Sequence, residues 1–453
     1  MNILLVNPWI YDFVAYDLWL KPLGLLYIAS FLEKFEHRVY LINCLDRNHP
    51  VLKEKYKDHL PPSRRYDCGK FFSQEIEKPA ILKDIPRRYK RYGIPLDIFE
   101  EELTRIKTPD VIGVTSGMTY WYPGVFEVIR RLKEKFSDVP CVLGGIYATL
   151  CYEHAKKYSG ADYVIKGHGE LSMLKIVNKI EGREKEYPEV YLKKTINTLL
   201  PAYHLLSSTK SVAILTSRGC PFSCSYCASR LIEPRFIQRE PESVLKEINW
   251  YAKNFKVEDI AFYDDALLVN ASKHIIPILK GIVRKSLEVR FHTPNGLHVR
   301  YITREIAKLF YAANFKTIRL SLESVSPERQ KDSSNKVTRE DFLRCVDNLN
   351  KAGYRPDELD AYVMVGLPGQ EIQEVVETLE FAHKAGVRVK IVQFSPIPGT
   401  PEFEKAFKES NLSLDEPLLQ NNSIFPLWMR KISYEDLYRI KNMALKFNQE
   451  LSK

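Results

Sequence analysis

Three cysteines lie close together in the middle of the chain, with the spacing C-x3-C-x2-C, at Cys220, Cys224 and Cys227. Soft thiolate ligands select zinc, copper(I) or iron–sulfur clusters. A structural zinc site needs four ligands, whereas the nearest other cysteines, Cys151 and Cys345, are distant in sequence and no histidine completes a zinc ribbon. Three cysteines on one loop therefore favour a 4Fe–4S cube whose fourth iron is open to a small molecule. The alternative is three buried cysteines without a metal, which is hard to explain as packing alone.

The elements around this motif alternate between strands and helices from Val212 onward. Pro241-Glu242-Ser243 and Thr338-Arg339-Glu340 are typical of helix starts, and Gly353 of a helix end. Six strand–helix units predict a partial (β/α)6 TIM-type barrel over residues 206–400, followed by a helical tail over 401–453. In such barrels the active site lies at the carboxyl ends of the strands, and the cysteine motif directly follows the first strand. The predicted strands are 212–217, 259–264, 289–293, 317–322, 359–365 and 388–394.

The first part of the chain shows a similar alternation and predicts an α/β domain over residues 1–185. Strands separated by helices imply a doubly wound, flavodoxin-like (Rossmann-like) parallel sheet, whose ligands sit over the carboxyl ends of the strands. An insertion at about 46–108 exceeds ordinary loop lengths, and 186–205 is the predicted linker. The predicted strands of this domain are 2–7, 38–43, 111–116, 141–145 and 161–167.

Composition excludes several classes of protein. The 453 residues are 45% hydrophobic and 27% charged, and the formal net charge is +10. These values are ordinary for a globular protein and do not require nucleic acid. The start lacks a basic leader, and the apolar stretch Leu18–Leu32 is too short to span a bilayer, so we expect a cytoplasmic protein whose eight cysteines are reduced. The basic, aromatic run Pro86–Tyr92 favours a solvated helix face. The alternative is a clamp for an anionic substrate or peripheral contact with lipid headgroups.

The cysteine motif resembles that of the radical S-adenosylmethionine (SAM) superfamily. That resemblance implies that the open iron binds SAM, which is cleaved reductively to a deoxyadenosyl radical, with an external electron donor such as flavodoxin or ferredoxin. Further segments at the barrel strand ends look like SAM-contacting segments of that family: Phe262-Tyr-Asp-Asp265, Leu320-Ser-Leu-Glu-Ser324, Val365-Gly-Leu-Pro-Gly369 and Phe394-Ser-Pro-Ile-Pro-Gly-Thr400. The SAM-binding residues implied in this way are Tyr226, Tyr263, Asp264, Asp265, Glu323, Gly366, Leu367 and Pro396.

The N-terminal domain looks like the cobalamin-binding domain that precedes many barrels of that superfamily. The D-x-H-x-x-G motif, whose histidine ligates cobalt in mutases, is missing, and Asn7-Pro-Trp-Ile-Tyr11 follows the first strand instead. Many members that lack this histidine still bind cobalamin. The alternative is a sheet domain that has lost the cofactor and only shields the barrel. The candidate cobalamin-binding residues lie at predicted strand ends: Thr115, Ser116, Gly117, Gly144, Gly145, Gly167, Gly169 and Glu170.

The resemblance leads us to expect an enzyme that methylates an unactivated carbon of a small molecule with SAM, a 4Fe–4S cluster and cobalamin. The alternatives are a radical enzyme that cyclises, oxidises or rearranges its substrate, and an iron–sulfur or cobalamin sensor. His292 and Asn295, at the end of the third barrel strand, are candidate catalytic or substrate-contacting residues. A core histidine with a satisfied partner is the competing interpretation of His292.

Overall fold

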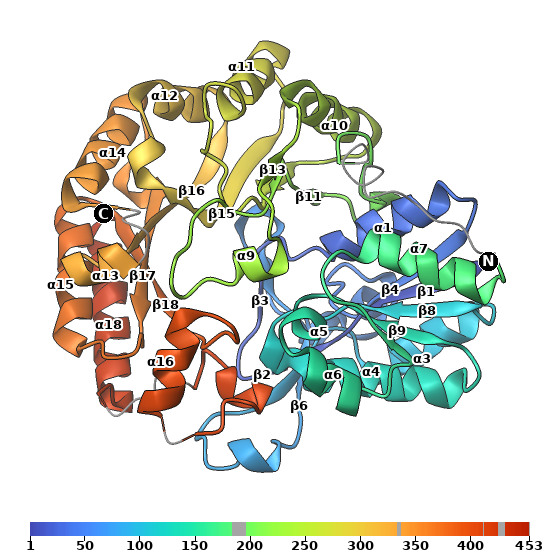
Figure 1. Ribbon diagram of the computed structural model, residues 1–453. Coiled ribbons are helices and arrows are strands. Elements are labelled where there is room, and N and C mark those ends of the chain that lie inside the picture. Colours follow the sequence, from blue (N-terminus) through green and yellow to red (C-terminus); the bar gives the residue numbers. More distant parts are fainter. Residues whose placement is uncertain (184–195, 333–336, 411, 425–430, 453) are drawn as a thin grey trace. The chain divides into compact units, whose positions relative to one another are not determined.

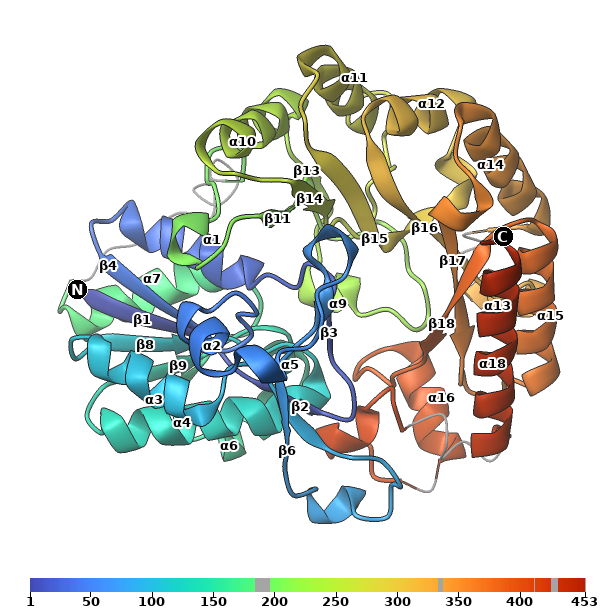
Figure 2. The same ribbon diagram turned by 180° about the vertical axis from the view of Figure 1, so that it is seen from behind.

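The computed structural model describes residues 1–183, 196–332, 337–410, 412–424 and 431–452. Its contacts divide the chain into two compact units, Met1–Val212 and Ala213–Lys453. The first part of the predicted linker, 186–195, lies outside the described residues. In the described part of the chain, no helix has both the length and the apolar character that a membrane crossing requires. Figures 1 and 2 show the elements of each unit.

The first unit is built on a five-stranded parallel sheet with the order β10-β9-β8-β1-β4. Its chain order reverses between β1 and β8, which is the switch point where doubly wound sheets bind ligands. The strands read as apolar runs because both faces of the sheet are covered by helices. The strands are β1 (Asn2–Asn7), β4 (Arg38–Asn43), β8 (Val111–Val114), β9 (Cys141–Leu143) and β10 (Tyr163–Val164). The helices are α1 (Leu23–Glu33), α2 (Pro50–Lys55), α3 (Leu96–Arg105), α4 (Tyr122–Lys135), α5 (Ile146–Leu150), α6 (Tyr152–Tyr158) and α7 (Gly169–Ile180).

The insertion of the first unit forms a small antiparallel sheet with the order β2-β7-β6. Its strands are β2 (Ile10–Asp12), β6 (Ser73–Glu75) and β7 (Lys90–Tyr92), and a second pair joins β3 (Tyr16–Asp17) to β5 (Gly69–Lys70). The expectation of a solvated helix face in the basic run was wrong, because Lys90–Tyr92 is a strand. Tyr89, Arg91 and Tyr92 are buried, and the Arg91 guanidinium lies 5.6 Å from the centre of the Trp9 ring.

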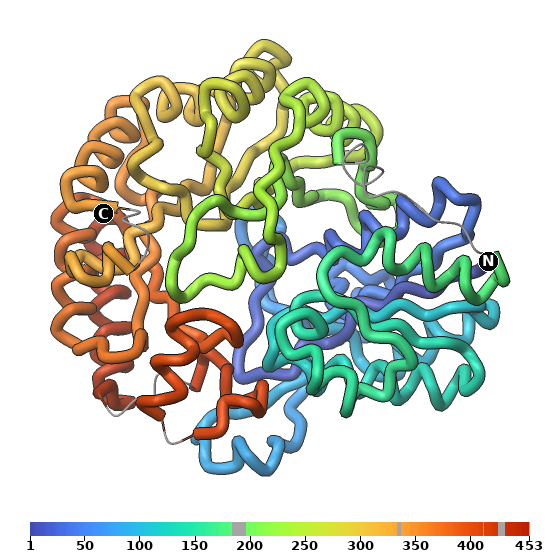
Figure 3. The backbone as a smooth tube through the Cα atoms, viewed as in Figure 1, coloured from blue at the N-terminus to red at the C-terminus, as the bar shows by residue number. Residues whose placement is uncertain are grey.

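The second unit is a six-stranded parallel sheet with the order β11-β14-β15-β16-β17-β18, covered by helices that follow the strands. Figure 3 traces the course of the backbone through this unit. The strands are β11 (Ser211–Ile214), β14 (Asp259–Phe262), β15 (Arg290–His298), β16 (Phe315–Glu323), β17 (Leu359–Val365) and β18 (Arg388–Gln393). The helices are α10 (Pro241–Asn254), α11 (Ile275–Lys285), α12 (Arg304–Ala312), α13 (Pro327–Asp332), α14 (Arg339–Ala352), α15 (Ile372–Lys384), α16 (Pro401–Glu409) and α18 (Tyr434–Glu450).

A long loop after β11 carries the three cysteines, and short strands tie its two ends together. β12 (Ser217–Arg218) pairs antiparallel with β13 (Ile237–Gln238), and α9 (Ser229–Ile232) lies between them. Gly219 follows β12 with φ +75°, and a Cβ there would lie 2.7 Å from the Arg235 carbonyl oxygen. Only glycine fits this left-handed position at the start of the loop.

Candidate functional site

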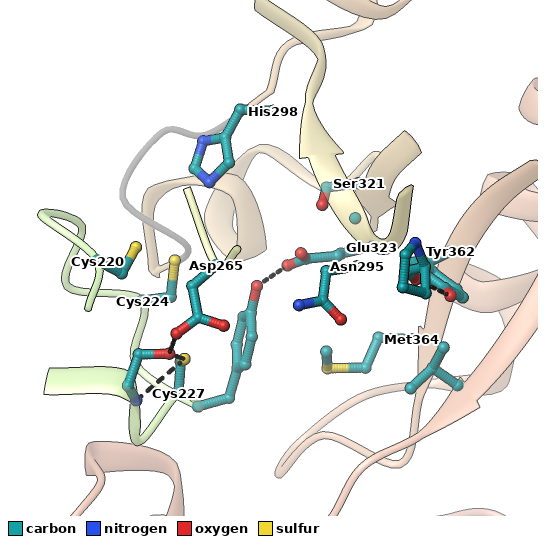
Figure 4. Close-up of a pocket in the computed structure, with 15 residues that line it drawn as sticks. Cys220, Cys224, Cys227, Asp265, Asn295, His298, Ser321, Glu323, Tyr362 and Met364 are labelled. Atoms are coloured by element: carbon teal, nitrogen blue, oxygen red, sulfur yellow. Dashed lines mark hydrogen bonds between the residues drawn. The ribbon is translucent and has the colours of Figure 1, made fainter. Parts of the chain in front are cut away.

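One cavity at the carboxyl ends of the barrel strands brings the three cysteines together with polar side chains (Figure 4). Its volume is about 410 Å³. Cys220 and Cys224 are half-buried and Cys227 is exposed. The cavity is lined by Cys220, Cys224, Tyr226, Cys227, Ser229, Asp265, Pro294, Asn295, Gly296, His298, Ser321, Glu323, Tyr362, Met364 and Val392.

The donor set fits a multinuclear cluster better than a single ion. Within the described part of the chain, no group of three His, Cys, Asp or Glu side chains is arranged to hold one metal ion. A tetrahedral zinc site would draw its ligands to one point, whereas a 4Fe–4S cube takes each thiolate on a separate corner. Three soft thiolates that line one cavity fit three corners of such a cube.

The electrostatics of the cavity favour a cationic guest. The carboxylates of Asp265 and Glu323 are among the lining side chains, and no lysine or arginine is among the described residues that line the cavity. Burial, with the negative charge of Asp265 and of the other two cysteines, raises the pKa of the Cys220 thiol to about 11. SAM carries a sulfonium and an ammonium group, so its charge complements such a cavity.

Tyr226 and Glu323 both line the cavity, and the Tyr226 hydroxyl donates a hydrogen bond to the Glu323 carboxylate. Burial and the neighbouring Glu323 carboxylate raise the pKa of Tyr226 well above its usual range. Glu323 ends β16 in the left-handed region, with φ +65°. A non-glycine residue held there stores strain, and such strain often accompanies a functional site.

The structure brings only some of the predicted SAM-binding residues to the cavity. Tyr226, Asp265 and Glu323 line it, whereas Asp264 is buried behind it. Asp264 accepts hydrogen bonds from the Thr216 amide and from the Ser217 hydroxyl, at 3.0 and 2.6 Å, so it joins the first two barrel strand ends. Tyr263, Gly366, Leu367 and Pro396 are not among the lining residues.

The side chain of Gln370, which is not among the predicted site residues, holds the segment after β17. The amides of Gly366 and Leu367 both donate to Oε1 of Gln370, at 2.8 and 3.2 Å, and Gly366 has φ +91°. This arrangement makes a fixed turn beside the cavity.

Of the two candidates on the third barrel strand, only Asn295 reaches the cavity. Its side-chain amide donates to the Tyr263 carbonyl at 2.9 Å. The His292 side chain does not line the cavity. It is fully buried and bonded to Asp259 and Thr317, as the interpretation of a core histidine with a satisfied partner expects. His298 lines the cavity instead and stacks on Phe222 of the cysteine loop, with ring centres 4.2 Å apart. The predicted strand ended at residue 293, whereas β15 extends to His298, so His298 was not among the candidates.

The candidate cobalamin-binding residues lie at the carboxyl ends of β8, β9 and β10 and around the start of α7. The Ser116 hydroxyl donates to the Gly144 carbonyl at 2.6 Å, and a Cβ on Gly145 would lie 2.7 Å from the Ser116 nitrogen. The Gly167 amide donates to the Thr149 hydroxyl at 3.0 Å, and a Cβ on Gly167 would meet open space. Thr115, Gly117 and Gly169 lie beside them, and Glu170 is buried in α7. Small residues at the carboxyl ends of these parallel strands would let a long nucleotide tail approach the backbone, so these residues fit cobalamin.

Comparison with known families agrees with this geometry. Residues 214–382 match the model of the radical SAM superfamily, and residues 94–177 match that of the B12 binding domain. The chain is therefore a radical SAM enzyme that carries a B12-binding domain. These two domains imply a 4Fe–4S cluster, SAM and cobalamin as its cofactors.

Individual relatives are distant. The uncharacterized methyltransferase PH0819 of Pyrococcus horikoshii is 26% identical over 333 residues, which cover 67% of this chain and 71% of the relative. The anaerobic magnesium-protoporphyrin IX monomethyl ester cyclase of Rubrivivax gelatinosus is 24% identical over 63% of this chain and 56% of its own length.

Solved structures show the same fold. The radical SAM methyltransferase TsrM of Kitasatospora setae superposes with a TM-score of 0.66 at 18% identity, over 90% of this chain and 76% of that chain. The cobalamin-dependent SAM radical enzyme OxsB superposes with a TM-score of 0.55 at 15% identity, over 94% of this chain and 56% of that chain.

Proposed function

We propose that the protein is a cobalamin-dependent radical SAM methyltransferase that methylates an unactivated carbon of a small molecule. The observation that carries the proposal is the shared cavity of Cys220, Cys224, Cys227, Asp265 and Glu323 in a chain that also has a B12-binding domain. The names of PH0819 and TsrM, both methyltransferases, support it.

In this proposal each side chain of the cavity has a binding role. Cys220, Cys224 and Cys227 hold the cluster and leave one iron for the amino and carboxylate groups of SAM. The exposed Asp265 carboxylate accepts a hydrogen bond from the iron-bound SAM amino group, and Glu323 contacts the ribose. The turn at Gly366 and Leu367, fixed by Gln370, contacts adenine through its backbone.

When bound, the cluster supplies the electron that cleaves SAM, and cobalamin carries the methyl group. The barrel residues position SAM and substrate and keep water away. The strand ends at Ser116, Gly145 and Gly167 hold the corrinoid tail. A flavodoxin or ferredoxin is the proposed electron donor, and the cytoplasm is the proposed compartment.

A radical cyclase is the second candidate, favoured by the similarity to the magnesium-protoporphyrin ester cyclase. The two candidates differ in their products. Methyl transfer by two SAM molecules yields deoxyadenosine and S-adenosylhomocysteine together, whereas cyclisation yields deoxyadenosine alone. A sensor would bind the cofactors without cleaving SAM.

The test is anaerobic incubation of reconstituted protein with SAM, titanium citrate and cobalamin, followed by mass spectrometry of the nucleosides. We expect both nucleosides in the presence of a substrate, and a corrinoid absorbance that survives gel filtration. Deoxyadenosine without S-adenosylhomocysteine would favour the cyclase. Cluster-loaded protein that leaves SAM intact would contradict both enzymes.

A further inference from the structure

Ser229 links the cluster cysteine Cys227 to the carboxylate of Asp265. Its hydroxyl oxygen lies 3.2 Å from the Cys227 sulfur, and its amide nitrogen lies 3.4 Å from the same sulfur. The same hydroxyl donates to Oδ2 of Asp265 at 2.9 Å. The dashed lines between Cys227 and Asp265 in Figure 4 mark this chain of contacts.

The position of Ser229 follows from the local fold. Ser229 begins α9, two residues after Cys227, so its amide points back toward the sulfur. Asp265 lies just beyond the end of β14, and its exposed carboxylate reaches the cavity. One short hydroxyl therefore bridges the cysteine loop and the second barrel strand.

A serine hydroxyl has only one hydrogen to donate. While Cys227 is a thiol, its S–H can donate to the Ser229 oxygen, and the hydroxyl hydrogen goes to Asp265. A thiolate bound to iron can only accept, so sulfur and carboxylate then compete for the same hydrogen. The charged carboxylate is the stronger acceptor, and it retains the hydrogen unless another donor neutralises it.

We propose that Ser229 is a positioning residue that couples occupancy of Asp265 to the reduction potential of the cluster. A SAM amino group that donates to Asp265 weakens the hold of this carboxylate on the Ser229 hydroxyl, which can then turn toward the Cys227 sulfur. Hydrogen bonds to cluster sulfurs stabilise the reduced, more negative cluster and raise its potential. The cluster thus accepts an electron more readily when the amino acid part of SAM is in place. This inference rests on the proposed hydrogen bond from the SAM amino group to Asp265.

The test is a redox titration of the full-length, cluster-loaded protein with dithionite, followed by electron paramagnetic resonance of the reduced cluster. S-adenosylhomocysteine is the probe, because it keeps the amino acid part of SAM but lacks the sulfonium and cannot be cleaved in the same way. We expect the probe to raise the midpoint potential of the wild-type protein. The shift should disappear in Ser229→Ala, which keeps the amide donor, and return in Ser229→Thr.

Ser225→Ala is the matched control, because the Ser225 hydroxyl lies in the same loop but donates to Glu402 at 3.0 Å. It should keep the shift. An equal shift in wild-type and Ser229→Ala protein would overturn the inference. So would the absence of a shift in wild-type protein to which the probe binds in equilibrium dialysis.

A second comparison needs no probe. Asp265→Ala removes the competing acceptor, so its cluster should have a higher potential than the wild type, and adding Ser229→Ala should lower that potential again. Equal potentials in the single and double variants would contradict the coupling. These measurements of the midpoint potential do not depend on methyl transfer. A Ser229-dependent shift of the potential in a protein that forms no methylated product would contradict the proposed function and leave the coupling intact.

Discussion

The Nε2 atom of His292 lies 2.9 Å from Oδ1 of Asp259, and both side chains are fully buried. Oγ1 of Thr317 lies 3.0 Å from Nδ1 of the same ring. Arg290 donates through Nε to the same Oδ1 of Asp259 at 2.7 Å and through Nη2 to Oδ2 at 2.8 Å. Burial holds the pKa of His292 below its usual range despite the nearby Asp259 carboxylate. The ring is thus held in its neutral form inside the barrel.

This relationship predicts that acid destabilises the barrel. A histidine with a lowered pKa takes up its proton more readily in the unfolded chain, so stability present above about pH 6.5 is lost as the pH falls. The buried His274, whose pKa burial lowers to about 4, acts in the same direction. Each extra proton bound by the unfolded chain lowers the free energy of unfolding by about 1.4 kcal/mol per pH unit.

Calorimetry between about pH 7.5 and pH 5 measures this loss as a lower Tm. His292→Gln should lower the Tm at neutral pH and weaken its dependence on pH. The same slope in the variant and the wild type would show that His292 does not titrate on unfolding.

The cysteine loop yields a second prediction. Cys224→Ser should lose the broad visible absorbance and most of the iron of the reconstituted cluster, because an alcohol is a poor ligand for this soft site. Deoxyadenosine formation should fall to background. Cys151→Ser, a half-buried cysteine of the first unit, should keep both properties. Normal cluster content in Cys224→Ser would refute the assignment of the ligands.

We expect substitution of Glu323 to lower the activity more than the stability. Glu323→Gly relieves the left-handed strain at φ +65°, about 1 kcal/mol, and loses a hydrogen bond to a charged group of about 1.5–3 kcal/mol. We expect a small fall in the Tm, whereas deoxyadenosine formation should fall at least about tenfold, the effect of about 1.4 kcal/mol in the barrier. Wild-type rates of SAM cleavage would exclude a role for the carboxylate in binding SAM.

We expect a substitution at Gly145 to destabilise the first unit and weaken its binding of a corrinoid. With φ +95° and the Ser116 backbone in the way of a Cβ, Gly145→Ala should cost about 2 kcal/mol or more and should reduce corrinoid retention after gel filtration. Gly24→Ala, in α1 with open space around it, is the matched control and should stabilise the unit by about 0.5–1 kcal/mol. Unchanged stability and retention in Gly145→Ala would contradict this account.

Apolar runs predicted the strands well. Asn2–Asn7, Arg38–Asn43 and Leu359–Val365 occur with the predicted ends, because buried parallel strands are continuous apolar segments bounded by turn residues. The β2-β7-β6 sheet was missed because its strands have only three residues each, too few for a periodic pattern.

The candidate site was less predictable than the fold. Cysteine spacing identified Cys220, Cys224 and Cys227 without any structure, because metal ligands on one loop form a local pattern. The links from Tyr226 to Glu323 and from Ser229 to Asp265 join segments from different strands, and no local pattern contains them. Asp264 and Asp265 are adjacent in sequence, yet the backbone turns one inward and the other into the cavity.

The β12–β13 pair joins the two ends of the cysteine loop by backbone hydrogen bonds. Joined ends restrict the conformations open to the loop. Its three sulfurs therefore lose less chain entropy when they take up iron than they would on an unpaired segment of the same length.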